Sequence, residues 1–287
     1  MPGKGGQTGR FSNGLELVRL SFSVISKNKK LLVFPFLSGF SAMIILATFL
    51  VGFIFAMPAM QSLPSWLWVL VGFLIYLILY FITFFFNAAL VACAMATMEG
   101  GMPTIGYGIS MASKRLGRIF MWALISAIIG TILQAIRERA GILGRIAVSL
   151  LGAAWTVATY FVIPIIVFED VGAWDSMKRS YQLLKSSWGE GLVGYVAMSL
   201  IFGLLAIAGL IPVILVVVLI KSLWALIIGV VAYVVYLVFL AALAATARGV
   251  IQAALYRYAT TGKIAIQMPS WFPPPPAAYM PPPPVQM

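Results

Sequence analysis

The hydrophobic positions of the chain fall into six long runs, and short polar segments separate them. A membrane-spanning helix needs roughly 20 consecutive, mainly apolar residues. Runs of about this length or longer lie at 31–57, 66–98, 120–136, 146–168, 192–220 and 223–247. Because the runs are continuous and do not alternate with polar residues, the pattern predicts an all-α bundle of six transmembrane helices.

Three of the polar segments carry a second pattern, in which apolar residues recur three and four positions apart. Residues at this spacing share one face of a helix. The stripes are Phe11, Leu15, Val18, Phe22 and Ile25, then Ile105, Ile109, Ala112, Leu116 and Ile119, then Trp174, Met177, Tyr181, Leu184 and Trp188. The pattern predicts three cytoplasmic amphipathic helices that lie flat on the membrane, each before a hairpin of two spans. This unit occurs three times along the chain.

Capping residues predict where two of these helices begin. Asn13 and Glu16 have the spacing of a capping box, so the first amphipathic helix is expected to begin near Asn13. Glu169 and Asp170 precede the third helix, and the pair has two interpretations: a metal site, or acidic residues at a helix N-terminus with Asp170 as the N-cap. The second interpretation is favoured because acidic side chains there interact favourably with the helix dipole.

The C-terminal part of the chain changes character after the sixth span. Residues 248–261 are expected to form a helix that leaves the membrane, with Tyr256 and Tyr258 at the depth of the lipid headgroups. We predict a disordered N-terminus at 1–10, a transmembrane domain at 11–262 and a disordered, proline-rich tail at 263–287. The tail is either a spacer or a docking segment for a protein that binds polyproline.

An even number of spans places both ends of the chain on one side of the membrane. Most of the 19 lysines and arginines fall on that side, and the exceptions are Arg137, Arg139, Arg145 and Lys221. Because cytoplasmic loops of membrane proteins are enriched in basic residues, both termini are expected in the cytoplasm. We therefore predict a multi-pass protein of the cell membrane.

Composition narrows the chemistry further. The net charge is +12, but the basic residues stand at the ends of apolar runs and no nucleic-acid recognition module is present, so nucleic acid is not an expected partner. The chain has no histidine and one cysteine, Cys93, which we expect to be buried. The seven acidic residues lie at the edges of the spans. We therefore expect no enzymatic activity, no cofactor and no metal ion.

Three blocks of sequence resemble a known family. They are GRFSNGLELVRLSFSVISKNKKLLVFPFLSG, VIPIIVFEDVGAWDSMKRSYQLLKSSWGEGL and AALYRYATTGK. Together they resemble prokaryotic six-helix membrane proteins known only as a domain of unknown function, over residues 9–265. The central block is also similar to the membrane domain attached to some glycerophosphodiester phosphodiesterases. The resemblance implies a six-helix fold and no activity, because the catalytic barrel of those enzymes has no counterpart here.

Two functions compete at this point. The leading hypothesis is a non-enzymatic scaffold or accessory subunit, which interacts with membrane lipids or a membrane complex through its interfacial helices. The residues expected at the membrane interface are Trp174, Tyr181, Trp188, Phe22, Arg115 and Arg118.

The alternative is a small-molecule transporter or permease. Its candidate intramembrane contacts are Asn87, Thr83 and Gln134, although polar residues in spanning helices also form hydrogen bonds between helices. Pro212 lies inside the fifth span and predicts a kink there. A central cavity lined by the polar residues would favour transport, whereas a bundle packed throughout by alanine and glycine would oppose it.

Overall fold

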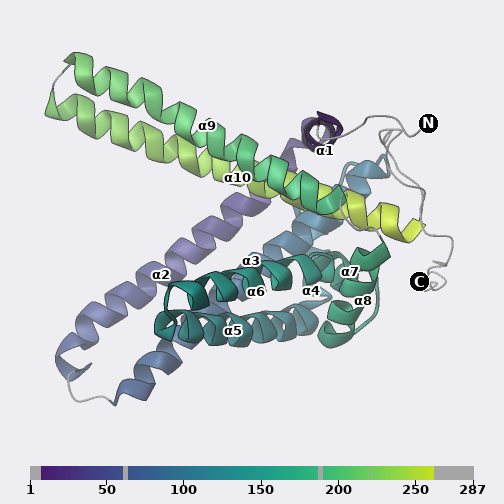
Figure 1. Cartoon of the computed structure of the whole chain (residues 1–287), viewed down its shortest axis with the longest axis horizontal. Helices are drawn as coiled ribbons and strands as arrows, with labels where there is room; N and C mark the ends of the chain where they lie inside the picture. The colour runs from purple at the N-terminus through teal and green to yellow at the C-terminus, as the bar shows by residue number, and fades with distance from the viewer. Residues whose placement is uncertain (1–7, 61–63, 187–189, 221, 262–287) are drawn as a thin grey trace.

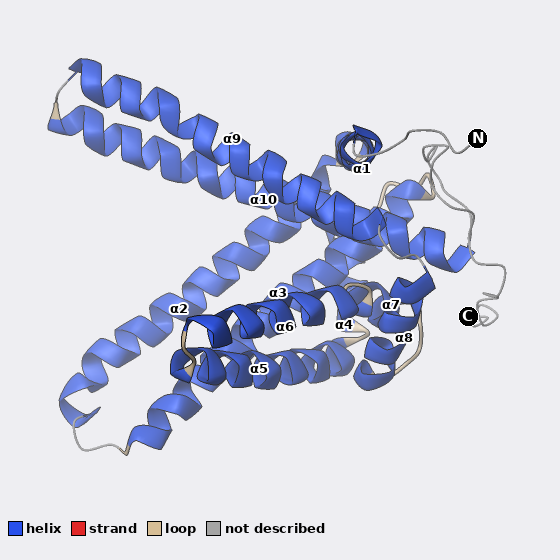
Figure 2. Ribbon diagram, viewed as in Figure 1, coloured by secondary structure: helices blue, strands red, loops and turns tan. Residues whose placement is uncertain are grey.

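The chain folds into helices joined by short turns (Figure 1). The computed structural model describes residues 8–60, 64–186, 190–220 and 222–261, and these ranges contain no strand (Figure 2). The elements are α1 (Thr8–Lys27), the 3₁₀ turn η1 (Lys29–Leu32), α2 (Val33–Met60), α3 (Ser65–Met98), α4 (Ile105–Ser113), α5 (Leu116–Arg139), α6 (Ile142–Ala158), α7 (Val162–Phe168), α8 (Ala173–Ser186), α9 (Glu190–Ile220) and α10 (Leu223–Thr261).

Six helical segments of the described chain are long and apolar enough to cross a bilayer. They are Lys29–Phe55, Trp66–Met98, Leu116–Arg139, Ile142–Phe168, Leu200–Ile220 and Leu223–Thr261. The predicted all-α fold with six long apolar helices is therefore confirmed. The prediction that three cytoplasmic interfacial helices each precede a membrane hairpin stays a prediction.

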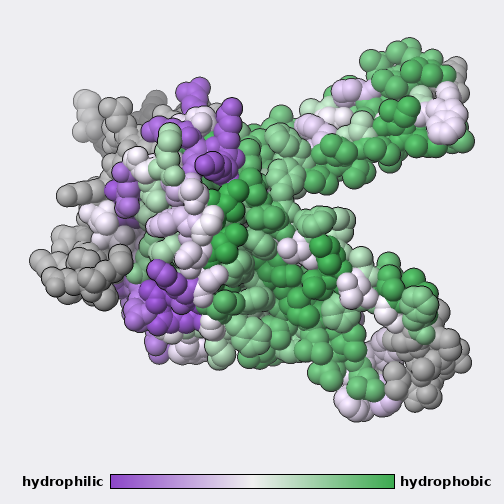
Figure 3. All heavy atoms as spheres, turned by 180° about the vertical axis from the view of Figure 1, so that it is seen from behind, coloured by the Kyte–Doolittle hydropathy of each residue, from purple (hydrophilic) through white to green (hydrophobic). Residues whose placement is uncertain are grey.

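Two pairs of long helices extend from the rest of the molecule as separate arms (Figure 1). One arm pairs α2 with α3, and the other pairs α9 with α10. Large apolar side chains are exposed along both arms, among them Leu50, Phe55, Leu219 and Trp224. Seen from behind in Figure 3, the arms are mostly hydrophobic, and hydrophilic residues gather at the end where the arms meet. Such surfaces suit a lipid environment along the arms and water at that end.

The buried core lies at the end where the arms meet. It is built from the second halves of α3 and α10 and from the short α7, and Val91, Ile165 and Val250 are fully buried there. The three shorter polar helices cover it: α1 contacts α9 and α10, α4 contacts α3, and α8 contacts α7. The predicted amphipathic helices thus contribute one face each to protein packing.

The contact between α4 and α3 explains a glycine inside a helix. A Cβ at Gly108 would lie 2.7 Å from both the Ala89 carbonyl oxygen and the Cys93 sulfur, and 2.8 Å from Phe34 Cζ. Only glycine therefore fits at this approach of the two backbones. Cys93 is 1 % exposed, which confirms the prediction that it is buried.

Two local predictions are wrong. The first helix begins at Thr8, so Asn13 lies inside α1 and not at its N-cap. The last helix continues to Thr261, but Tyr256 and Tyr258, each 5 % exposed, lie in the core and not among lipid headgroups. The physical reason is that the second half of α10 packs against α3 and α1 and is enclosed by protein.

Candidate functional site

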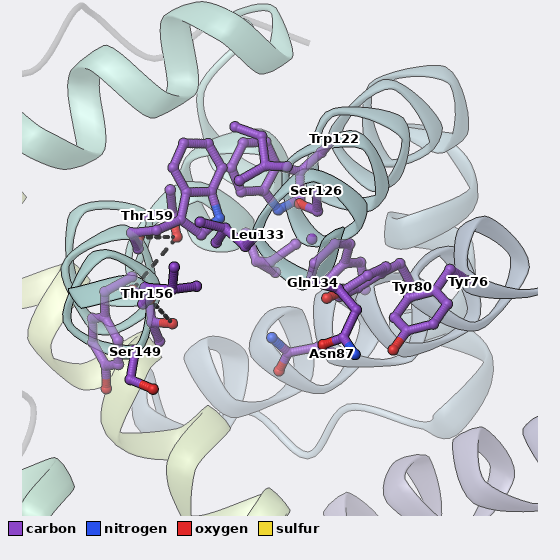
Figure 4. Close-up of a pocket in the computed structure, with 18 of the residues that line it drawn as sticks. Tyr76, Tyr80, Asn87, Trp122, Ser126, Leu133, Gln134, Ser149, Thr156 and Thr159 are labelled. Carbon is purple, nitrogen blue, oxygen red and sulfur yellow. Dashed lines mark hydrogen bonds between the residues drawn. The ribbon is translucent and has the colours of Figure 1, made fainter. Parts of the chain in front are cut away.

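A cavity of about 670 Å³ lies among the spanning helices α3, α5 and α6, with residues of α7 and α10 also in its wall (Figure 4). This volume falls within the roughly 300–1,000 Å³ of small-molecule binding sites. Aromatic rings form much of the wall, and two of them, Trp122 and Trp155, stack with their ring centroids 5.8 Å apart. The side chain of Arg137 carries the one charge in the wall, as far as the structure describes it.

The wall contains a buried hydroxyl group that has no hydrogen-bond partner among the described residues. This group is the Oγ of Ser126, a residue that is 5 % exposed. Hydroxyl groups at Thr83 and Thr156 instead donate to the carbonyl four residues earlier in their own helices. An unpartnered buried hydroxyl is uncommon in folded proteins, and here it belongs to a residue in the wall of a cavity large enough for another molecule.

The helix predicted as the fourth span is interrupted beside the cavity. α6 ends at Ala158 and α7 begins at Val162, so the intervening backbone cannot make all of its helical hydrogen bonds. Ser180 of α8 bridges the interruption: its Oγ accepts from the N–H of Phe161 at 3.0 Å and donates to the carbonyl of Ala158 at 2.7 Å. Irregular backbone at membrane depth is tolerated where protein groups or a cavity satisfy it in this way.

Pro164 explains why the interruption lies where it does. Proline has no N–H, so Pro164 cannot donate to the carbonyl of Tyr160, four residues earlier. The side-chain amide of Gln252, from α10, donates to this carbonyl instead. Asn87 of α3 donates in turn to the Gln252 side-chain oxygen at 3.3 Å. A chain of hydrogen bonds thus joins α3 and α10 to the interrupted helix at the wall of the cavity.

The structure separates the three predicted intramembrane polar residues. Asn87 and Gln134 line the cavity, and Gln134 also donates to the Glu138 carboxylate at 2.8 Å. Thr83 is exposed and outside the cavity wall, with its hydroxyl bonded to its own helix. Sequence reasoning missed Ser126 and Gln252. The position of Pro164 shows that the carbonyl of Tyr160 needs another donor, but it does not identify Gln252 as that donor.

The acidic pair before α8 is held by arginines. Asp170 lies 2.6 Å from Arg115 and 2.5 Å from Arg118, while Glu169 pairs with Arg179 at 3.3 Å. The hydrogen bond and charge of Arg118, aided by Arg115, hold the pKa of Asp170 below its ordinary value. The prediction of Asp170 as an N-cap is wrong, because α8 begins three residues later. The described residues also contain no cluster of metal ligands around the pair.

The predicted membrane-interface residues divide into two groups. Phe22, Trp174 and Tyr181 are 38 %, 54 % and 55 % exposed, so their side chains are open to a lipid surface. Arg115 and Arg118 are instead engaged with Asp170. Trp188 lies outside the described residues.

The fold and cavity together define a polytopic helical membrane protein with a hollow inside its spanning region. The chain belongs to a family of unknown function (DUF6159), which matches residues 67–266 and so includes the whole cavity wall. This match confirms the resemblance to an uncharacterised membrane-protein family. A comparison with curated proteins finds no match.

Proposed function

We propose that the protein is a non-enzymatic carrier that binds a small molecule in the intramembrane cavity and moves it across the bilayer. The observation that carries this proposal is the position of a 670 Å³ cavity, with polar groups in its wall, beside an interrupted spanning helix. Transport proteins bind their substrates near the middle of the membrane, where discontinuous helices supply polar groups.

The depth of the cavity supports movement across the bilayer. Its wall on α5 runs from Trp122 to Arg137. At about 1.5 Å per residue this stretch covers roughly 22 Å along the helix axis. The hydrocarbon core of a bilayer is about 30 Å thick. The cavity therefore extends along most of the thickness of the hydrocarbon core.

The interrupted helix offers a place for such a rearrangement. Hydrogen bonds from Ser180 and Gln252 hold the break, and both come from other helices. A shift of α7 relative to α6 would break them and alter the wall at Tyr160.

The orientation belongs to the same proposal. We place the protein in the cell membrane with both termini in the cytoplasm, because basic residues are enriched on the cytoplasmic side of membrane proteins. The residues toward the end where the arms meet include Lys27, Lys29, Lys30 and Arg248, whereas Arg137 stands at the far end of α5. The ion pairs of the acidic segment before α8 then lie on the cytoplasmic side.

Solute flux into liposomes tests the proposal. The purified protein, reconstituted in liposomes, should pass at least one member of a broad panel of neutral and charged solutes. Gly152→Leu should reduce this flux, because Gly152 lines the cavity and the new side chain would occupy part of it. The substitution should fit without a clash, since the nearest described atom to an added Cβ belongs to Leu133, at 4.0 Å. Gly52→Leu is the matched control, because Gly52 faces open space on α2.

Flux equal to that of empty liposomes for the whole panel would refute the carrier. Equal flux through the Gly152 and Gly52 variants would also refute it, because passage would then not use the cavity.

A scaffold or accessory subunit is the second candidate function. The exposed aromatic side chains of Trp174 and Tyr181 on α8 support it, since amphipathic aromatic groups suit lipid headgroups or a membrane partner. The proline-rich tail at 263–287, proposed as a partner-binding segment, lies outside the described residues. Co-purification of a stoichiometric partner in mild detergent, with no solute flux, would favour this candidate over the carrier.

A further inference from the structure

We infer that the cavity takes an amphipathic molecule with an uncharged, hydrogen-bonding polar group, which reaches the cavity from the lipid phase. This inference rests on the proposed carrier function and names its substrate class. Three features of the cavity lead to it: its open side, the chemistry of its wall and the unpartnered hydroxyl of Ser126.

Exposed residues in the wall indicate that the cavity opens along the sides of spanning helices. Tyr76 of α3 and Ser149 and Thr156 of α6 all line it, yet all three are exposed. They lie within segments long and apolar enough to cross the bilayer. An opening at this depth faces acyl chains and not water. A molecule that passes through it must be soluble in lipid over part of its length.

The wall does not provide for a charged group at mid-depth. No acidic side chain is present in the described wall, so a cation would lack a counter-charge in a medium of low dielectric constant. The guanidinium of Arg137 stands near the end of α5, away from the middle of the span. Hydroxyl and amide groups, with the stacked rings of Trp122 and Trp155, therefore set the chemistry of the deeper part.

Ser126 marks where the polar group of the occupant binds. It lies ten residues beyond the start of α5, which places it roughly 15 Å along the helix axis and close to the middle of the bilayer. Ser126 is one of the residues that line the cavity, and its buried hydroxyl has no partner among the described residues (Figure 4). Rotation about its Cα–Cβ bond would turn this hydroxyl toward the cavity. A carbonyl or hydroxyl group of a bound molecule would complete its hydrogen bonding. The acyl chain of that molecule would leave through the open side near Thr156.

The probe is a monoacylglycerol that carries bromine atoms on its acyl chain, because its head group is uncharged and bromine quenches tryptophan fluorescence. The full-length protein is placed in nanodiscs, and the quenching lost in the Trp122→Phe/Trp155→Phe double variant measures occupancy of the cavity. We expect saturable quenching by this probe. A single-chain quaternary ammonium amphiphile with the same brominated chain should quench these two tryptophans much less.

Ser126→Ala tests the binding position. Because the Ser126 hydroxyl makes no hydrogen bond within the described protein, its removal should leave the fold intact. Loss of one hydrogen bond to the probe should weaken its binding about fivefold. Thr83→Ala is the matched control, since that hydroxyl lies outside the cavity and should not affect binding.

Each result has a distinct meaning. Saturable quenching by the monoacylglycerol that weakens in Ser126→Ala supports the inference. Cavity-dependent flux of glycerol without monoacylglycerol quenching would overturn the inference and leave the carrier function standing. Equal quenching by the cationic amphiphile, or equal binding by Ser126→Ala and wild type, would also overturn it. Absence of both flux and quenching would overturn the carrier function itself.

Discussion

Replacing Ser180 with alanine tests whether one hydroxyl group holds the interrupted helix in place. Ser180 is fully buried in α8. Its Oγ accepts the N–H of Phe161 and donates to the carbonyl of Ala158, so it serves both ends of the break. In Ser180→Ala both backbone groups lose this partner, and neither has a helical partner to replace it because the α-helical ladder stops between them.

The magnitude follows from these two groups. A buried backbone group without a partner costs about 1–3 kcal/mol. Two such groups give a loss of about 2–6 kcal/mol, with the lower part of the range appropriate where water enters from the polar end. A loss of about 3 kcal/mol should lower Tm by roughly 6–12 °C for a chain of this size.

Reaction of Cys93 with a thiol-reactive fluorophore during heating measures this change. Cys93 is the one cysteine of the chain and is 1 % exposed, so it reacts when the core opens. The matched control is Ser176→Ala, which is equally buried on α8 but donates to Gly172 at the start of its own helix. Equal falls in Tm for the two variants would refute the role assigned to Ser180.

Three further predictions follow from other contacts. Gly108→Ala should destabilise the protein by about 1–3 kcal/mol, because the new Cβ would lie 2.7 Å from a main-chain oxygen of α3. An unchanged Tm would contradict this close approach. Asp170 has a depressed pKa because of Arg118, so its stabilising effect should be complete above the ordinary aspartate pKa of about 3.9 and be lost as pH falls through the lower folded value. Tm measured against pH should therefore fall more steeply in wild type than in Asp170→Asn, and added salt should reduce the difference. Trp174 and Tyr181 are exposed on α8, so the Trp174→Ala/Tyr181→Ala variant should lose contacts with lipid and not contacts within the protein. Hydrogen exchange of α8 should then be faster in nanodiscs, while Tm in detergent stays the same. Unchanged exchange would argue against a lipid contact.

The long helices were predictable because their cause is local. A run of apolar residues that is long enough to cross a bilayer is visible without knowledge of its neighbours. Each of the six runs corresponds to a long apolar helical segment, although the fourth is divided into α6 and α7. The burial of Cys93 followed from the same pattern. The boundaries were less accurate: α1 begins at Thr8, before the predicted start near Asn13.

The packing face of α8 was not predictable from its apolar stripe, although Val18 and Ile25 of the first stripe and Ala112 of the second are buried. On α8 the sequence favours a face that contains Trp174 and Tyr181, and both are more than half exposed. The buried face instead includes Ser176, Ser180 and Leu183. Serine at a helix surface looks like a solvent-facing residue until its partner is known. Here the partner of Ser180 is the broken backbone between α6 and α7.

Part of the cavity could be anticipated and part could not. Asn87 and Gln134 are conspicuous in sequence because polar residues are rare in apolar runs, and both line the cavity. Gln252 lies in a segment expected to leave the membrane, and only the arrangement of α10 beside α7 brings it to the carbonyl of Tyr160. Ser126 could not be anticipated, because small residues such as serine are common in the apolar runs of spanning helices.

The sequence by itself determined that this is a helical membrane protein. The length and hydropathy of each apolar run make a helix across the bilayer more favourable than exposure of the same run to water. The break before Pro164 was not predicted from the sequence, because Pro212 removes a donor in the same way and α9 runs through it as one helix. The tertiary structure decided which groups satisfy that break and where a cavity remains. Those outcomes depend on contacts between residues as far apart in the chain as Asn87 and Gln252, and no local pattern specifies such contacts.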